Sequence, residues 1–358
     1  MKNNSLLKRA ACVGIVAGLA GLPSMDAAAQ KVDFADKRVE LIVPFAPGGG
    51  ADTYARALAP HLEKHLPGHP TIIVRNIPGG GSVPGANQFE ARAKPDGLTA
   101  LAVSSSTVFN SVFAKKKVKY QVNGWQPVVL SPQGTVVYLA AGLGVQSAKD
   151  IAKLKNQNLK FGGKTPTSSE MRMALAMELL GIDVNFIWGV ERGEARLAME
   201  RGEFNISYDT TPAYNKHVVA LIKSGKFVPL FTFGVLDNKG NYVRDPNFPD
   251  LPSFVEVYEM VHGKKPSGAP FEAFRTVFQM AIMASKGLVL PAGTPQPVVD
   301  AWRTAVKGIL DDPEFEKTAA SIVENYPQFL GEDVRPILRE ATEFTPEGWD
   351  WLKRFMKT

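Results

Sequence analysis

Short apolar runs alternate along the chain with longer segments whose apolar residues recur at helical spacing. Runs rich in β-branched residues predict strands at 38–45, 71–76, 98–103, 136–140 and 159–161. The helical spacing predicts helices at 51–66, 83–93 and 171–180. Ser or Thr just before the last of these predicts its N-cap. Strands that alternate with helices indicate an α/β fold with mostly parallel sheets.

Glycine, serine and threonine follow directly after four of the predicted strands. The loops are 46–52 (APGGGAD), 77–82 (IPGGGS), 104–107 (SSST) and 162–169 (GGKTPTSS). Glycines let several backbone N–H groups converge at a helix N-terminus, where the helix dipole favours a negative group. Ligands of open α/β sheets lie beyond the carboxyl ends of the strands. The pattern therefore predicts an anion held between loops of the first half and loops of the middle of the chain.

The N-terminus has the features of an export signal. A basic start and a short apolar stretch at 10–22 precede the small residues 27–29, which predicts a signal peptide over 1–29. The only cysteine, Cys12, lies within it and would be removed with it. No later run approaches the about 20 apolar residues that cross a bilayer. We expect an exported, periplasmic protein without thiol or disulfide.

Charge excludes one class of partner. The chain of 358 residues has a formal net charge of +6, which falls to +4 without residues 1–29. The only tight basic cluster, at 115–117, has no interleaved aromatic residues, so we predict no nucleic-acid partner. The remaining length of about 330 residues exceeds the usual single core and predicts two domains.

Enzyme motifs fail on their spacing. Residues 80–84 (GGSVP) miss a nucleophile elbow because Pro84 replaces its last glycine. Asn158 stands where a phosphate loop ending at 163–165 needs its first glycine. His61 and His65 flank a Glu in neither zinc-protease order and fit a solvent-facing helix. We therefore predict no catalytic residue, no cofactor and no metal.

Six motifs in collinear order resemble the Bug-type receptors of tripartite tricarboxylate transporters. In the first half they are 43–52 (VPFAPGGGAD), 74–82 (VRNIPGGGS), 95–99 (PDGLT) and 125–128 (WQPV). In the second half they are 251–254 (LPSF) and 290–295 (LPAGTP). The resemblance covers nearly the whole chain after residue 30.

This resemblance implies a type II periplasmic-binding-protein fold, with two doubly wound α/β domains around a ligand cleft. Domain 1 would comprise 31–130 plus 252–358, and domain 2 would comprise 131–251. The implied ligand is a small organic carboxylate. The expected ligand-binding residues of domain 1 are Pro47, Gly48, Gly49, Ala51, Asp52, Ser104, Ser105 and Ser106. Those of domain 2 are Gly163, Thr165, Thr167, Ser168, Tyr208 and Asp209.

Several of these positions have a structural alternative. Asp52 begins a helix, where it serves as a cap or contacts the ligand, and the same choice holds for Asp209. Tyr208 stacks on an aromatic acid or packs in the core. The stretch 186–190 (FIWGV) lacks the basic residue that the family has there, and 242–274 is longer than the family norm. These departures leave the identity of the ligand open.

The expected function is capture of a small organic carboxylate and its delivery to a membrane transporter of the tripartite tricarboxylate type. We expect a monomer whose partners are the ligand and the transporter subunits. One alternative is an exported hydrolase or lyase that acts on a small acid in the same cleft. Another is a receptor that presents the ligand to a signalling partner. A receptor releases its ligand unchanged, whereas an enzyme needs a nucleophile or an acid–base pair.

Overall fold

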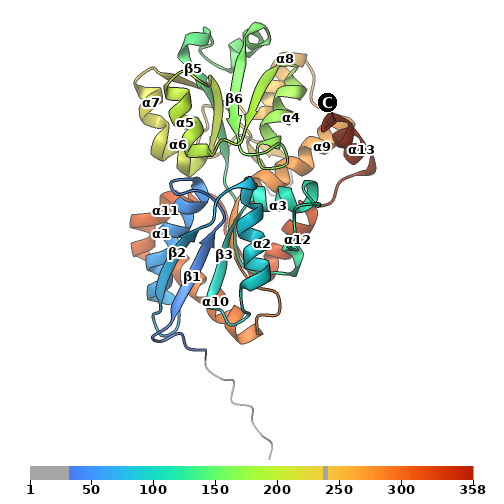
Figure 1. Ribbon diagram of the computed structural model, residues 1–358. Coiled ribbons are helices and arrows are strands. Elements are labelled where there is room, and N and C mark those ends of the chain that lie inside the picture. The colour runs from blue at the N-terminus through green and yellow to red at the C-terminus, as the bar shows by residue number, and fades with distance from the viewer. Residues whose placement is uncertain (1–31, 237–240, 358) are drawn as a thin grey trace, which may run out of the picture. The chain divides into compact units, whose positions relative to one another are not determined.

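The computed structural model describes residues 32–236 and 241–357, which are drawn in colour in Figure 1. The predicted signal peptide and Cys12 lie outside these residues. The described residues belong to one compact unit. Within the described ranges, no helix is long and apolar enough to cross a membrane.

A six-stranded mixed sheet organises the N-terminal and C-terminal parts of the chain. Its strand order is β13-β4-β12-β3-β1-β2. The strands are β1 (Arg38–Val43), β2 (Thr71–Asn76), β3 (Thr99–Ser104), β4 (Gln126–Ser131), β12 (Lys286–Leu290) and β13 (Phe329–Leu330). β1 runs parallel to β2 and β3, whereas β12 and β13 run antiparallel to their neighbours.

Amphipathic helices cover this sheet. They are α1 (Gly50–His65), α2 (Val83–Arg92), α3 (Ser105–Phe113), α10 (Gln296–Leu310), α11 (Pro313–Val323) and α12 (Val334–Glu340). On α1, Tyr54, Leu58 and Leu62 are almost fully buried and pack with β1 and Trp302 of α10 in one core cluster. Each such side chain contributes about 1.5–3 kcal/mol by leaving water, which fixes α1 and hence the loop before it.

The middle of the chain forms two smaller sheets. β5 (Thr135–Ala140) lies between β8 (Ile206–Thr210) and β9 (Phe227–Thr232), antiparallel to both, and β6 (Leu159–Gly163) pairs parallel with β7 (Val184–Trp188). A hairpin joins β10 (Val235–Leu236) and β11 (Tyr242–Val243). The helices here are α4 (Met171–Leu180), α5 (Arg192–Glu200), α6 (Thr211–His217), α7 (Val219–Lys223), α8 (Phe254–His262) and α9 (Ala269–Phe278). α13 (Pro346–Phe355), from the C-terminal end of the chain, packs against α9.

Short 3-10 and π turns complete the described elements. They are η1 (Gly80–Ser82), η2 (Val122–Gly124), η3 (Ala141–Leu143), η4 (Ala148–Asn156), η5 (Gln279–Met283) and η6 (Gly331–Asp333). The chain leaves the six-stranded sheet after β4 and returns to it at β12. α8 and α9 both pack against α4. The division into 31–130 plus 252–358 and 131–251 stays a prediction.

Three local expectations are wrong. His61, expected on a solvent-facing helix surface, is 6% exposed and packs edge-on against Phe315. The sheets are mixed rather than mostly parallel, because β12 and β13 come from the C-terminal segment and run against β3 and β4. The N-cap of α4 is Glu170 rather than Ser or Thr. The Ser168 hydroxyl instead lies within hydrogen-bond distance of both the Thr165 carbonyl oxygen (2.7 Å) and the Glu170 carboxylate, so it is not available as a cap.

Candidate functional site

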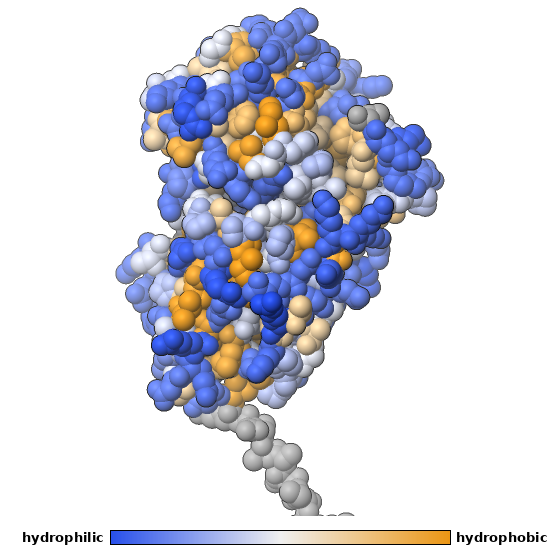
Figure 2. Space-filling view, viewed as in Figure 1, coloured by the Kyte–Doolittle hydropathy of each residue, from blue (hydrophilic) through white to orange (hydrophobic). Residues whose placement is uncertain are grey.

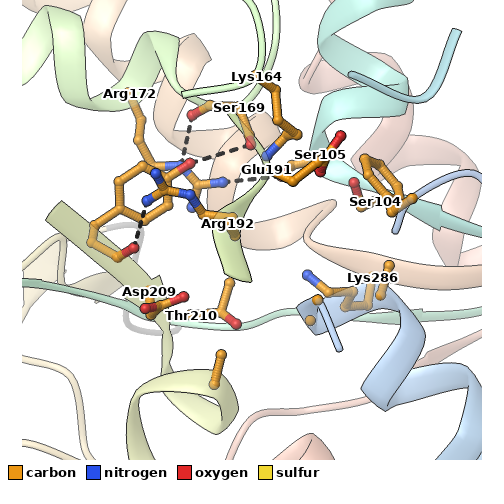
Figure 3. A pocket seen from close by; sticks show the side chains of 16 residues that line it. Ser104, Ser105, Lys164, Ser169, Arg172, Glu191, Arg192, Asp209, Thr210 and Lys286 are labelled. Carbon is orange, nitrogen blue, oxygen red and sulfur yellow. Dashed lines mark hydrogen bonds between the residues drawn. The ribbon is translucent and has the colours of Figure 1, made fainter. Parts of the chain in front are cut away.

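A pocket lies where the loops after the strands of the six-stranded sheet meet those after the strands of the smaller sheets (Figure 3). Its volume is about 60 Å³, room for a few waters or a small ligand in this conformation. One side is formed by Phe45, Gly49, Gly50, Ala51, Ser104, Ser105 and Lys286. The other is formed by Lys164, Ser169, Arg172, Glu191, Arg192, Tyr208, Asp209, Thr210 and Ala213.

The N-terminus of α1 provides part of the first side. Its N-cap, Gly49, has no side chain with which to cap the helix, so the positive end of the helix dipole reaches the pocket. Asp52 accepts hydrogen bonds from the Gly48 N–H (2.9 Å), Arg56 Nε (2.9 Å) and Asn76 Nδ2 (2.9 Å). Burial raises the pKa of the Asp52 carboxyl, but these donors lower it overall. Asp52 thus fixes the shape of the glycine loop.

The N-terminus of α3 uses its amides internally. The Ser105 N–H donates to the Ser285 carbonyl oxygen (3.1 Å), and the Ser106 N–H donates to Ser104 Oγ (3.2 Å). Ser106 Oγ donates to Ser169 Oγ (2.9 Å) and accepts from the Ser169 N–H (3.2 Å). Ser106 therefore joins the two sides of the pocket, while Ser104 and Ser105 line it.

Arg172, on α4, is the most deeply buried cation of the pocket. Its side chain is 1% exposed, and Nη2 donates to Ser105 Oγ (3.0 Å) while Nη1 donates to Thr135 Oγ1 (2.7 Å). Its Nε donates to the Ser169 carbonyl oxygen (2.9 Å). Burial lowers the pKa of Arg172, yet a guanidinium keeps its proton in proteins. The result is a fixed positive charge that spans both sides of the pocket.

Tyr208 lies close to two guanidinium groups. Arg172 is 5.0 Å and Arg192 is 4.7 Å from the centre of its ring, distances at which a cation is attracted to the aromatic face. The ring also stacks on Phe161 (5.8 Å). Arg192 is held by the carbonyl oxygens of Tyr208 (2.8 Å) and Gly162. Tyr208 is thus both a core residue and part of the pocket wall.

Glu170 does not line the pocket but forms ion pairs with two of the cations that do. It is fully buried, and its carboxylate pairs with Lys164 Nζ (2.6 Å) and Arg192 Nε (3.8 Å). Burial raises the pKa of the Glu170 carboxyl, but the charges of Lys164 and Arg192 lower it to about 2. Glu170 is therefore ionised at neutral pH and balances part of the charge of these two residues.

The Lys286 side chain, from the start of β12, extends into the pocket from the side opposite Arg172 and Lys164 (Figure 3). It pairs in register with Ser104 of β3 and Ser131 of β4, is 4% exposed, and donates to the Ser285 carbonyl oxygen (3.2 Å). Burial lowers its pKa, and the charges of Arg172 and Lys164 lower it further, to about 7. The Lys286 ammonium is thus only weakly stabilised in this site.

Asp209 is already neutralised by neighbours. It pairs with Arg196 Nη1 (2.7 Å) and accepts a hydrogen bond from the Tyr138 hydroxyl (2.9 Å). Burial raises the pKa of the remaining pocket carboxyl, Glu191.

In the part of the chain that the structure describes, neither Arg172 nor Lys286 forms an ion pair with a carboxylate. The pocket therefore has uncompensated positive charge, which is costly to bury and favours an anionic guest.

The structure brings some of the sequence-predicted residues together and separates others. Gly49, Ala51, Ser104, Ser105, Tyr208 and Asp209 line the pocket. Pro47 and Gly48 line an adjoining hollow that shares Gly49, Glu191 and Arg192 with it. Asp52, Ser106, Gly163 and Ser168 are buried and do not line it. Thr165 and Thr167 line a separate groove.

The side chains that give the pocket its charge were not predicted from the sequence; they are Lys164, Arg172, Arg192 and Lys286. A signal was present for two of them. Arg172 interrupts the otherwise apolar start of α4, and Lys286 stands at the head of an apolar strand. A charged residue among apolar ones is rarely fully buried unless it is paired with another polar or charged group. Among the residues described, no group of His, Cys, Asp and Glu could hold a metal ion.

Comparison with known proteins gives consistent matches. The sequence profile described as "Tripartite tricarboxylate transporter family receptor" matches residues 54–327. A UPF0065 protein of Bordetella pertussis is 29% identical over 323 residues, which cover 88% of this chain and 87% of that protein.

Solved structures match over nearly the same length. The periplasmic binding protein BugD superposes with a TM-score of 0.70 at 21% identity, covering 90% of this chain and 99% of BugD. MatC from Rhodopseudomonas palustris, solved with bound malate, has a TM-score of 0.65 at 21% identity and covers 89% of this chain and 99% of MatC. At these identities the likeness shows a shared fold.

Proposed function

The chain belongs to the family of tripartite tricarboxylate transporter receptors, and from this premise we propose that it captures a small organic carboxylate in the periplasm for delivery to such a transporter. The observation that carries the proposal is the pocket in which Arg172 and Lys286 are buried without a carboxylate partner among the described residues. A bound carboxylate supplies the missing negative charge.

The pocket provides donors of three kinds for such an anion. The guanidinium of Arg172 and the ammonium of Lys286 give charge-assisted hydrogen bonds from opposite sides. The N-terminus of α1, at Gly49, adds the positive end of a helix dipole. The ligand-binding residues that we propose are therefore Gly49, Ser105, Arg172 and Lys286, with Tyr208 as an apolar wall. MatC, of the same fold, is known with malate bound, which makes malate a sensible first probe.

Within the described residues, the serine hydroxyls near the pocket lack a base that could activate them for attack on the ligand, which favours binding without chemical conversion. Ser105 Oγ is hydrogen-bonded to the Arg172 guanidinium (3.0 Å), which cannot accept a proton and so cannot activate the serine. Lys286 Nζ lies 3.5 Å from Ser285 Oγ, but Ser285 is completely buried and does not line the pocket. We therefore propose a receptor rather than the alternative hydrolase or lyase.

A thermal-shift screen of carboxylates tests this proposal. A ligand that binds only the native state raises the free energy of unfolding by RT ln(1 + [L]/Kd), about 2.7 kcal/mol at a hundredfold excess over Kd. We expect small carboxylates to raise the melting temperature and matched amines to leave it unchanged. Recovery of the carboxylate unchanged after a long incubation excludes hydrolysis or elimination. If amines stabilise as much as carboxylates, the proposal fails.

A further inference from the structure

Two sequence features that the ligand pocket does not use border one surface groove. The first is the second glycine loop, at 77–82, and the second is the lysine cluster at 115–117. The groove has a volume of about 710 Å³ and is also lined by residues 165–167 and by α13. It lies outside the ligand pocket and shares no lining residue with it.

The floor of the groove is apolar and aromatic. Phe113 stacks on Trp349 (5.7 Å) and contacts Phe344 edge-on (5.8 Å). Val83 adds an apolar side chain, and Met356 at the edge is 40% exposed. On the face shown in Figure 2, hydrophobic residues form only small patches among hydrophilic ones. Several apolar side chains therefore line one hollow of the surface.

The rim is positively charged. Lys115, Lys116 and Lys117 are all exposed, and none forms an ion pair within 32–236 and 241–357. Asn87 holds the turn, because its Nδ2 donates to the Lys117 carbonyl oxygen (2.9 Å) and its Oδ1 accepts from the Lys119 N–H (2.7 Å). The cations are thus presented on an ordered turn beside an apolar floor, which complements an acidic segment with an apolar side chain.

One loop, residues 164–170, lines the groove on one side and the ligand pocket on the other. Residues 165–167 line the groove, while Lys164 and Ser169 of the same loop line the pocket. Asn110 joins this loop to the glycine loop, because its Nδ2 donates to the Gly81 carbonyl oxygen (2.7 Å) and its Oδ1 accepts from Thr167 Oγ1 (3.0 Å). A shift of the loop on ligand binding therefore changes the wall of the groove.

The glycine loop is held in a costly conformation. Gly79, Gly80, Gly81 and Ser82 all have positive φ, and for Ser82 the value is 97°. A Cβ at Gly81 would lie 3.1 Å from Asn110 Nδ2 and 3.2 Å from Ser168 Cβ, so the close contact with the 164–170 loop needs glycine here. Strained backbone of this kind is retained mainly at functional sites.

We propose that this groove docks an acidic segment with an aromatic or aliphatic anchor, carried by the membrane partner, and that docking responds to the ligand through the 164–170 loop. The existence of a membrane partner rests on the proposed function. A protein segment fits better than a lipid surface because the apolar residues line a hollow, which a side chain can enter and a flat bilayer cannot.

Fluorescence anisotropy tests the proposal with the exported protein and a labelled synthetic peptide that has four acidic residues around one tryptophan. We expect saturable binding that weakens at least tenfold when Lys115, Lys116 and Lys117 are replaced by Gln. Met356→Ser should weaken it at least threefold. The matched control replaces exposed lysines Lys160, Lys223 and Lys226 by Gln, which removes the same charge elsewhere and should leave binding unchanged. Equal peptide affinity of both triple variants overturns the docking site.

The coupling is measured by repeating the titration with a saturating carboxylate, starting with malate. We expect at least a fivefold change in peptide affinity, and by reciprocity the same factor in carboxylate affinity. A carboxylate that binds but leaves peptide affinity unchanged overturns the coupling. Peptide binding without binding of any carboxylate supports the docking site and overturns the proposed function. Binding to phosphatidylglycerol vesicles that needs the three lysines, with no peptide binding, overturns the protein partner in favour of lipid.

Discussion

Affinity for the carboxylate should depend on pH through Lys286. Its ammonium lies among Arg172, Lys164 and Arg192, with Asp209 and Glu191 as the nearby carboxylates, and burial together with the first two cations lowers its pKa from 10.5 to about 7. A bound carboxylate favours the charged form of Lys286 and raises this pKa again. Binding of the ligand should therefore be accompanied by proton uptake that increases as the pH rises through 7.

The size of the effect follows from the protonated fraction of the free protein. With a pKa of about 7, roughly half of Lys286 is protonated at pH 7 and roughly one hundredth at pH 9. If the bound form stays protonated, affinity at pH 9 is roughly 50-fold weaker than at pH 7. Replacement by arginine, which keeps its charge throughout, should reduce this change to less than about threefold.

Calorimetry in buffers of different ionisation enthalpy measures the proton directly. We expect uptake of about half a proton at pH 7 and nearly one at pH 8.5 for the wild type, and none for Lys286→Arg. Equal affinity of the wild type at pH 7 and pH 9 would refute the reasoning. If the affinity of Lys286→Arg showed the same pH dependence, the proton taken up on binding would have to belong to a group other than Lys286.

The free protein should show the opposite trend with pH. Between pH 7 and 10.5 the unfolded chain binds the Lys286 proton more than the folded one does, so the free energy of unfolding rises with pH in this window. Below pH 7 the full cost of the buried ammonium is present. Lys286→Met should therefore stabilise the free protein most at pH 7 and least at pH 10, as measured by urea unfolding.

Substitutions at three further positions probe the pocket and its surroundings. Arg172→Lys should weaken carboxylate binding by about 2–4 kcal/mol in calorimetry, because one ammonium cannot reach both Ser105 and Thr135; unchanged affinity would remove Arg172 from the site. Glu170→Gln should lower the free energy of unfolding by about 3–5 kcal/mol, because it leaves buried cations unpaired. The stabilisation by ionised Glu170 should be complete above pH 4.5 and be lost as the pH falls towards 2, so a loss near neutral pH would contradict the assignment. Gly49→Val should abolish binding, because Gly49 lines the pocket and the larger side chain would occupy it. Gly49→Ala should leave binding intact, since a Cβ there meets only the Ala46 carbonyl oxygen at 3.5 Å. Normal binding by the valine variant would show that this loop is not part of the site.

The local elements were largely predictable from sequence, and their pairing was not. Helix 171–180 has the predicted bounds, and the predicted strand at 71–76 is β2. Local periodicity determines such elements because it reports which face is buried. The position of β12 between β3 and β4 depends on residues more than 150 positions away. No local pattern specifies that contact, so the sheet was expected to be mostly parallel.

The site was predictable where its residues follow strand ends. The strand-end pattern predicted the loops that contain Gly49, Ser104 and Ser105, which line the candidate pocket, because the carboxyl end of a strand directs the next loop to the edge of the sheet. Arg172 comes from the first turn of a helix and Lys286 from the start of a strand, and only the fold brings them to the same pocket. The loop pattern thus predicted an anion site held by backbone groups, whereas the pocket is dominated by side-chain charge.

Native mass spectrometry of the purified exported protein tests the central claim most directly. The protein would be incubated with an equimolar mixture of small carboxylates and of amines of matched size, and the retained compound would be identified after gentle release. We expect one carboxylate per chain, released with its mass unchanged, and none retained by Arg172→Met. Retention of an amine, or of a carboxylate by the variant as strongly as by the wild type, would contradict capture of an anion by the buried cations.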